Sequence, residues 1–286
     1  MIAHARAKPC IRHRRNHQKL SQETNMKFPR FRTTALALVG ASALCIGSLA
    51  SADVVRVSES NFNATAGLIT FSEFAMGTVN PTYLPTDYGG GAGAPTVNFG
   101  GWFTGQSLSA SPGVDCPGGV ASACVVGTPS AGLSLAADSS QTHIQSDGSA
   151  PNSPVLSGSP TFNGPIAVLF DTDQYGVGFD AGYFNAIGSL GLTAFKRDGT
   201  LLGTVSNLGL GIEFLGLVSM SGVADIAGVL FSLTGAEPAG FAIDGLRFGA
   251  VGDITPPSAV PLPGAAWLMM SGLGAMALRR RRQQQT

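Results

Sequence analysis

The feature that most constrains the fold is a series of short apolar segments between Ile166 and Phe248, separated by Gly, Asp, Asn and Pro. Residues 175–180 alternate between apolar and polar or small side chains, which is typical of a strand with one buried face. Asp198-Gly199 lies between two such segments and strongly favours a β-hairpin. No convincing amphipathic helix accompanies them. The expected strands are 54–57, 68–74, 97–103, 166–170, 175–180, 192–195, 201–205, 212–218, 226–233 and 241–248.

This pattern predicts an all-β fold, an antiparallel β-sandwich formed by residues 53–252. Within that domain, residues 76–165 are rich in Gly, Ser, Pro and Thr. We expect long Gly/Ser/Pro-rich loops there, or a partly mobile insertion, with one strand at 97–103.

The amino terminus predicts export. Residues 1–25 are basic and represent either a region upstream of the true start or an extended n-region, and Met26 opens a better signal peptide at 26–52. Basic residues are followed by an apolar run, and Ala50 and Ala52 give the small-residue pattern for cleavage before Asp53. Signal peptidase is therefore an expected partner.

The charge of the body differs from the zero net charge of the whole chain. Residues 53–252 contain fifteen acidic and four basic residues, which leaves a net charge near −11. Such an acidic surface argues against nucleic acid or anionic lipid as a partner.

Cys116 and Cys124 are the only cysteines of this body, and they flank a Gly-rich loop. In an exported chain such a pair predicts a local disulfide. A metal site would need more ligands than these two.

The carboxyl end has three parts. Val260, Pro261, Leu262, Pro263 and Gly264 form a short motif at the end of a linker, 253–264; a charge-free apolar run, 265–278, follows; Arg279, Arg280, Arg281 and Arg282 close it. As a helix, the apolar run would be about 21 Å long, shorter than the roughly 30 Å hydrocarbon core. We expect a short transmembrane helix with an arginine stop at 265–282, the arginines being cytoplasmic. The alternative is a buried carboxy-terminal helix.

This tripartite tail resembles the PEP-CTERM sorting signal of Gram-negative bacteria, although Leu262 stands where that motif commonly has Glu. The resemblance implies a transient stay in the inner membrane, recognition and cleavage by an exosortase-type protease, and delivery to the cell surface or extracellular medium.

The order of the apolar segments from Leu68 to Gly249 resembles jelly-roll domains of PEP-CTERM proteins, which are similar in layout to carbohydrate-binding modules. That resemblance implies a structural calcium between Glu73, after an early strand, and Asp244, in the last strand. The family commonly has two acids where this chain has Asp244-Gly245. Asp171 and Asp173 begin a second, EF-like calcium loop, but Tyr175 stands at a ligand position.

Residue types that would support catalysis are sparse. His143 is the only histidine of the body, and we expect it in an exposed loop. Two acids out of Asp171, Asp173, Asp180, Glu213 and Asp244 could serve a glycoside hydrolase only if they faced each other across a cleft. Carbohydrate stacking would use Trp102, Tyr83, Tyr88 or Tyr183.

These observations favour a non-enzymatic exported protein with a structural or adhesive role associated with exopolysaccharide. The alternatives are a calcium-stabilised carbohydrate-binding module and a polysaccharide hydrolase.

Overall fold

The computed structural model describes residues 53–118, 124–148, 154–238 and 240–256. Most of the predicted targeting elements lie outside these residues. They are the signal peptide with Ala50 and Ala52, the motif Val260–Gly264, the helix at 265–282 and the stop Arg279–Arg282.

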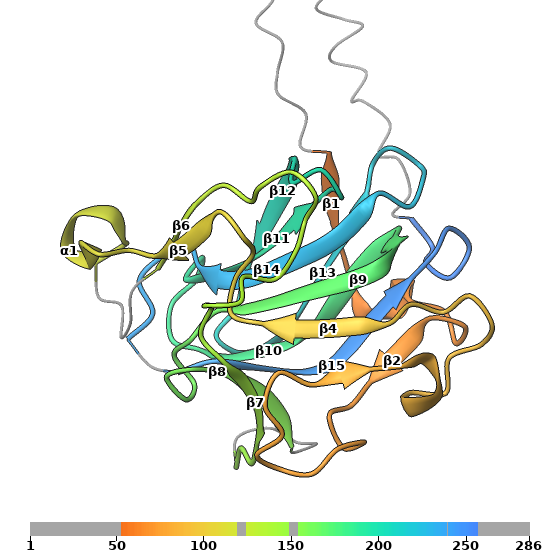
Figure 1. Ribbon diagram of the computed structural model, residues 1–286, viewed down its shortest axis with the longest axis horizontal. Coiled ribbons are helices and arrows are strands. Elements are labelled where there is room, and N and C mark those ends of the chain that lie inside the picture. The colour runs from red at the N-terminus through yellow and green to blue at the C-terminus, as the bar shows by residue number, and fades with distance from the viewer. Residues whose placement is uncertain (1–52, 119–123, 149–153, 239, 257–286) are drawn as a thin grey trace, which may run out of the picture. The chain divides into compact units, whose positions relative to one another are not determined.

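The first sheet has seven strands and contains both the first and the last strand of the described chain (Figure 1). Its order is β1 (Val54–Val57), β13 (Gly211–Ser219), β10 (Gly176–Phe184), β15 (Ala242–Gly249), β8 (Val155–Gly158) and β7 (Thr142–Gln145), and β2 (Gly67–Ile69) also pairs with β15.

The second sheet has six strands. Its order is β12 (Leu201–Ser206), β11 (Leu190–Phe195), β14 (Ile226–Leu233), β9 (Ile166–Gln174), β4 (Val97–Gly100) and β3 (Thr82–Tyr83). A separate ribbon of β5 (Gln106–Leu108) and β6 (Val125–Gly127) carries the short helix α1 (Pro112–Asp115). All these strand pairs are antiparallel, so the predicted all-β antiparallel architecture is confirmed.

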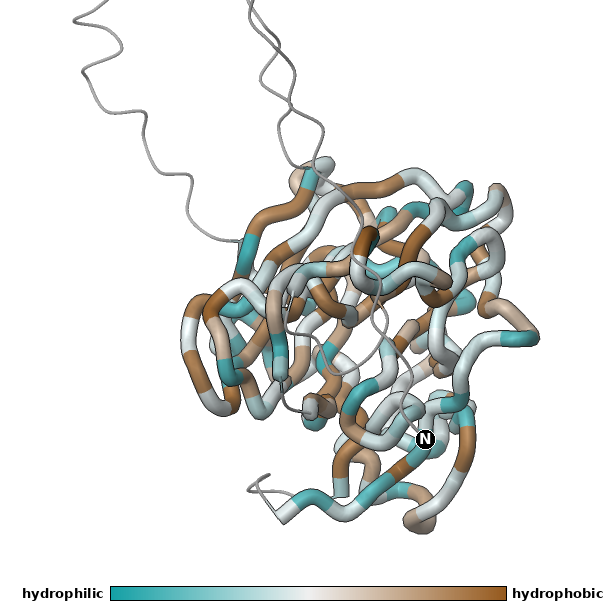
Figure 2. Tube along the Cα trace, turned by 90° about the vertical axis from the view of Figure 1, so that its left-hand side faces the viewer, coloured by the Kyte–Doolittle hydropathy of each residue, from teal (hydrophilic) through white to brown (hydrophobic). Residues whose placement is uncertain are grey.

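The core lies between the two sheets. Every second residue of the strands points inward, and rings from opposite sheets touch: the centroids of Phe179 on β10 and Phe231 on β14 are 5.2 Å apart. Hydrophobic and hydrophilic residues are interspersed along the Cα trace of the body (Figure 2). Burial of these alternate side chains is what selects the register of each strand.

The outer face of the first sheet is partly covered by the segments that follow β1 and β15. Phe62 packs edge-on against Phe214 of β13, with centroids 5.7 Å apart, and forms an antiparallel bridge with Ile254. Phe62 and Ile254 belong to a small cluster that is separate from the main core, and Phe214 packs against it. The rest of this outer face includes the acidic residues described below.

Residues 68–165 differ from the expectation in two details. The strand expected at 68–74 ends at Ile69, because Phe71 has a left-handed backbone (φ 57°) while its side chain remains fully buried. The described residues of 76–165 are mostly outside strands, as expected, but they contain six short strands where one was expected, and two of these, β7 and β8, extend the first sheet.

Candidate functional site

The most unusual group of side chains lies on the outer face of the first sheet. Asp180 of β10 and Asp244 of β15 are direct cross-strand partners. The pairing shifts register next to them, where Gly245 adopts φ +55°. A glycine in the left-handed region with an extra residue on its strand is a β-bulge. A Cβ atom at Gly245 would lie only 3.3 Å from Asp180 Oδ2, so the bulge also leaves room for that carboxylate.

Glu73 contributes a third carboxylate from the turn after β2. The backbone N–H and the hydroxyl of Thr70 both donate to Glu73 Oε1, each at 2.9 Å. Its other oxygen, Oε2, is buried and has no hydrogen-bond partner among the described residues. A buried carboxylate oxygen without a donor is costly, so this atom is a natural place for a cation or a bound donor.

The charges of these residues act on one another. Burial raises the pKa of the Asp244 carboxyl to about 6; the negative charges of Asp180 and Glu73 raise it as well, while the N–H of Gly245 opposes the rise. Burial and Glu59 likewise raise the pKa of Asp180, and Arg247 lowers it. Glu59, Glu73, Asp180 and Asp244 are called the acidic cluster below.

One cation lies beside this cluster. Arg247 of β15 forms an ion pair with Glu59, in which Nη2 is 2.7 Å from Oε1. Arg247 is on β15, like Asp244, and its cross-strand partner Gly178 is on β10, like Asp180. The cluster therefore keeps a net negative charge.

A calcium ion fits these residues in part. The sequence-predicted pair, Glu73 and Asp244, is close enough for one charge to shift the pKa of the other. However, no three His, Cys, Asp or Glu side chains converge on one point in the part of the chain that the structure describes. Since calcium takes six to eight oxygen ligands, backbone carbonyls and water would have to complete the shell.

The second predicted calcium loop is not a loop. Asp171 and Asp173 lie within strand β9, which pairs with β4 as far as Phe170 and reaches Gln174, the partner of Ile226 on β14. Asp171 Oδ1 accepts a hydrogen bond from Thr96 N at 2.9 Å, and Asp173 Oδ1 accepts one from Arg197 Nε at 3.0 Å. The EF-like interpretation of this segment was therefore wrong.

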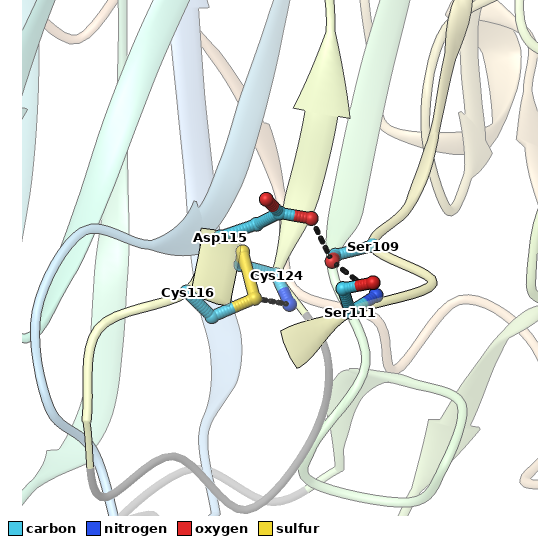
Figure 3. The surroundings of a disulfide bond; sticks show 5 residues. All are labelled: Ser109, Ser111, Asp115, Cys116 and Cys124. Atoms are coloured by element: carbon cyan, nitrogen blue, oxygen red, sulfur yellow. Dashed lines mark hydrogen bonds between the residues drawn. A yellow bond between two sulfur atoms is a disulfide. The ribbon is translucent and has the colours of Figure 1, made fainter. Parts of the chain in front are cut away.

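The two cysteines of the body form a disulfide, as their spacing predicts. The Cα atoms of Cys116 and Cys124 are 5.5 Å apart, and the bond links α1 to the start of β6. Ser109 Oγ donates to Asp115 Oδ2 at 2.6 Å and accepts from Ser111 N, so the end of the ribbon is also fixed by hydrogen bonds (Figure 3). The disulfide braces a protruding hairpin rather than the core.

The candidate sugar-stacking aromatics are mostly structural. Trp102 is 7% exposed and Tyr83 is fully buried, where it contacts Phe71 and Phe99 edge-on. Tyr88 packs against the buried ring of Phe248. Of the four, Tyr183 is the exposed one, at 53%.

His143 and Glu213 also have structural partners. His143 lies in strand β7, not in an exposed loop as expected, and its Nε2 is 3.2 Å from Thr161 Oγ1. Glu213 binds Arg56 and accepts the backbone N–H groups of Leu208 and Gly209. Among the acids considered for catalysis, the structure brings only Asp180 and Asp244 together, on adjacent strands.

The sequence reasoning missed that these two acids face each other. The alternation in 176–180 is a sequence signal that places Asp180 on the outward face. Its pairing with Asp244 has no such signal, because it depends on the bulge at Gly245.

Within the described residues, no helix has the length and apolar character needed to cross a membrane. Comparisons of the chain with protein-family models, curated proteins and solved structures find no match.

Proposed function

We propose that this chain is an exported cell-surface or extracellular-matrix protein of a Gram-negative bacterium, with a non-enzymatic structural or adhesive role associated with exopolysaccharide. The structural observation that supports export is the disulfide between Cys116 and Cys124, because such bonds persist in oxidising compartments. The sequence support is the PEP-CTERM-like tail, and the jelly-roll resemblance of the body belongs to the same proposal.

The intact mass of the protein recovered from the cell surface and medium tests this proposal. We expect a chain that starts at Asp53 and ends near Pro263. Replacing Arg279–Arg282 with glutamine should leave the tail uncleaved, because the basic stop holds the apolar segment at the membrane. Replacement with lysine keeps the charge and serves as the matched control. A wild-type mass that retains 265–286 would overturn the sorting proposal.

A calcium-stabilised carbohydrate-binding module is the second candidate, and the unpartnered Oε2 of Glu73 is the observation that favours it. At pH 7 we expect millimolar calcium to raise Tm by several degrees, since a ligand that binds only the folded state stabilises it by mass action. EDTA should reverse the shift.

The matched variants for that measurement are Glu73→Gln, which keeps an oxygen for the hydrogen bonds from Thr70, and Asp138→Asn at an exposed position. The glutamine variant should lose most of the calcium-induced shift and the asparagine variant should keep it. An identical Tm with calcium and with EDTA in the wild type would exclude this second candidate.

A further inference from the structure

A depression of about 700 Å³ opens at the end of the sandwich where β2 begins and β9 and β15 end. Its lining comes from segments 64–68, 88–95, 172–174 and 248–250, together with Asp253. We call it the loop depression. Its volume lies within the roughly 300–1,000 Å³ typical of small-ligand sites.

The depression is open because its walls carry small side chains. Most of its lining residues in 64–67 and 89–94 are Gly or Ala. The glycine backbones lie directly on two rings: an added Cβ would be 2.5 Å from the Phe248 ring at Gly67, and 2.7 Å from the Tyr88 ring at Gly90. Those two rings contact each other edge-on, with centroids 5.3 Å apart.

The glycine-rich wall is held at both ends. Gly90 N donates to Pro85 O at 2.7 Å, and the Tyr88 hydroxyl donates to Pro95 O at 2.5 Å. Immediately beyond, Thr96 N donates to Asp171 Oδ1 at 2.9 Å. The wall is therefore positioned before any ligand arrives, which reduces the ordering cost of binding.

The polar groups of the depression are mainly acceptors. Asp173, Gln174 and Asp253 line it together with the hydroxyls of Thr65 and Thr172, and its lining contains no Lys, Arg or His. Asp253 accepts hydrogen bonds from Thr65 Oγ1 at 2.7 Å and from Ala250 N at 2.9 Å, and Arg197 pairs with Asp173 from outside. Carboxylates accept hydrogen bonds and repel anions, so the depression suits a ligand rich in hydroxyl donors and without negative charge.

We propose that the loop depression is a subsite for a neutral segment of extracellular polysaccharide. This inference rests on the proposed association with exopolysaccharide and specifies where, and to which kind of saccharide, the protein binds. The loop depression selects uncharged sugars over uronate-bearing or sulfated ones.

The test uses the mature protein and exopolysaccharide purified from the producing cells, separated by anion exchange into neutral and acidic fractions. Gly91→Trp adds a large side chain at a lining residue without a clash at Cβ, because a Cβ at Gly91 meets nothing within 4 Å. Gly113→Trp in α1 is equally open, lies outside the depression, and is the matched control. Ala92→Trp is a second blocking variant in case the first does not fold.

We expect the wild type and Gly113→Trp to bind the neutral fraction with the same affinity, and each folded blocking variant to bind it at least about tenfold more weakly, a loss of about 1.4 kcal/mol. Unchanged binding by folded blocking variants would place the saccharide elsewhere and leave the proposed function standing. Tighter binding of the acidic fraction would overturn the selection for neutral sugars. Failure of the wild type to bind either fraction would instead overturn the association with exopolysaccharide.

Discussion

Replacing Phe231 with alanine is expected to lower the free energy of unfolding by about 3–5 kcal/mol, a large part of the total stability of one domain. Phe231 is fully buried on β14 of the second sheet. Its ring centroid lies 5.2 Å from that of Phe179, 6.4 Å from that of Phe184 and 5.4 Å from that of Phe241. Alanine would leave a cavity between the sheets and remove these edge contacts.

Urea unfolding measures this loss. Phe231→Leu keeps much of the buried volume and should cost clearly less than the alanine variant. Leu208→Ala is the matched surface control, because Leu208 is 66% exposed and its truncation should stay within about 0.5 kcal/mol. Equal unfolding midpoints for Phe231→Ala and wild type would mean that the two sheets are not joined through this ring.

Asp244→Asn is expected to stabilise the metal-free protein at pH 7 by roughly 2–3 kcal/mol, at about 1.4 kcal/mol per pKa unit. The pKa of Asp244 in the folded protein is about 6, raised by burial and by Asp180 and Glu73 from the ordinary value of 3.8. The folded state therefore binds more protons than the unfolded state between about pH 4 and pH 6. Consequently this residue lowers stability as pH rises through that window, and its cost stays constant above it.

The measurement is urea unfolding in EDTA from pH 4 to pH 7 for both proteins. The stability difference between them should grow up to about pH 6 and then level off. Hydrogen bonds from Thr200 lower the pKa of Asp198, so this residue raises stability as pH rises. Its contribution is the same in both proteins and cancels from the stability difference. Asp138→Asn, at an exposed position, controls for the change in net charge. A wild type more stable than Asp244→Asn at pH 7 would show that a cationic group compensates this carboxylate.

Local signals explain why the second half of the body was predictable. The hairpin at Asp198-Gly199 is present: Gly199 N donates to Lys196 O, and Thr200 N donates to Asp198 Oδ1, both at 2.9 Å. These bonds depend on residues adjacent in sequence, and the apolar runs bounded by turn residues that mark β14 and β15 are local signals as well.

The parts that the sequence did not predict depend on distant partners. β8 pairs with β15 through Ile243 and Leu156, which are 87 positions apart, and no local pattern marks that pairing. The end of β2 depends on Phe71 turning into the core with a left-handed backbone. For the acidic cluster, Glu73 and Asp244 were expected together from a family resemblance, whereas Asp180 joined them only because of the bulge at Gly245.

The contact between the first and last segments determines how the body would respond to a mechanical load. Thr255 N donates to Asn61 O at 2.8 Å, Asn61 Nδ2 donates back to Thr255 O at 2.9 Å, and Asn63 N donates to Asp253 O at 2.8 Å. A pull on the carboxyl end of a surface-attached body would load these three bonds before it reached β15. These hydrogen bonds would break first, and the strand pairing of the two sheets would be preserved.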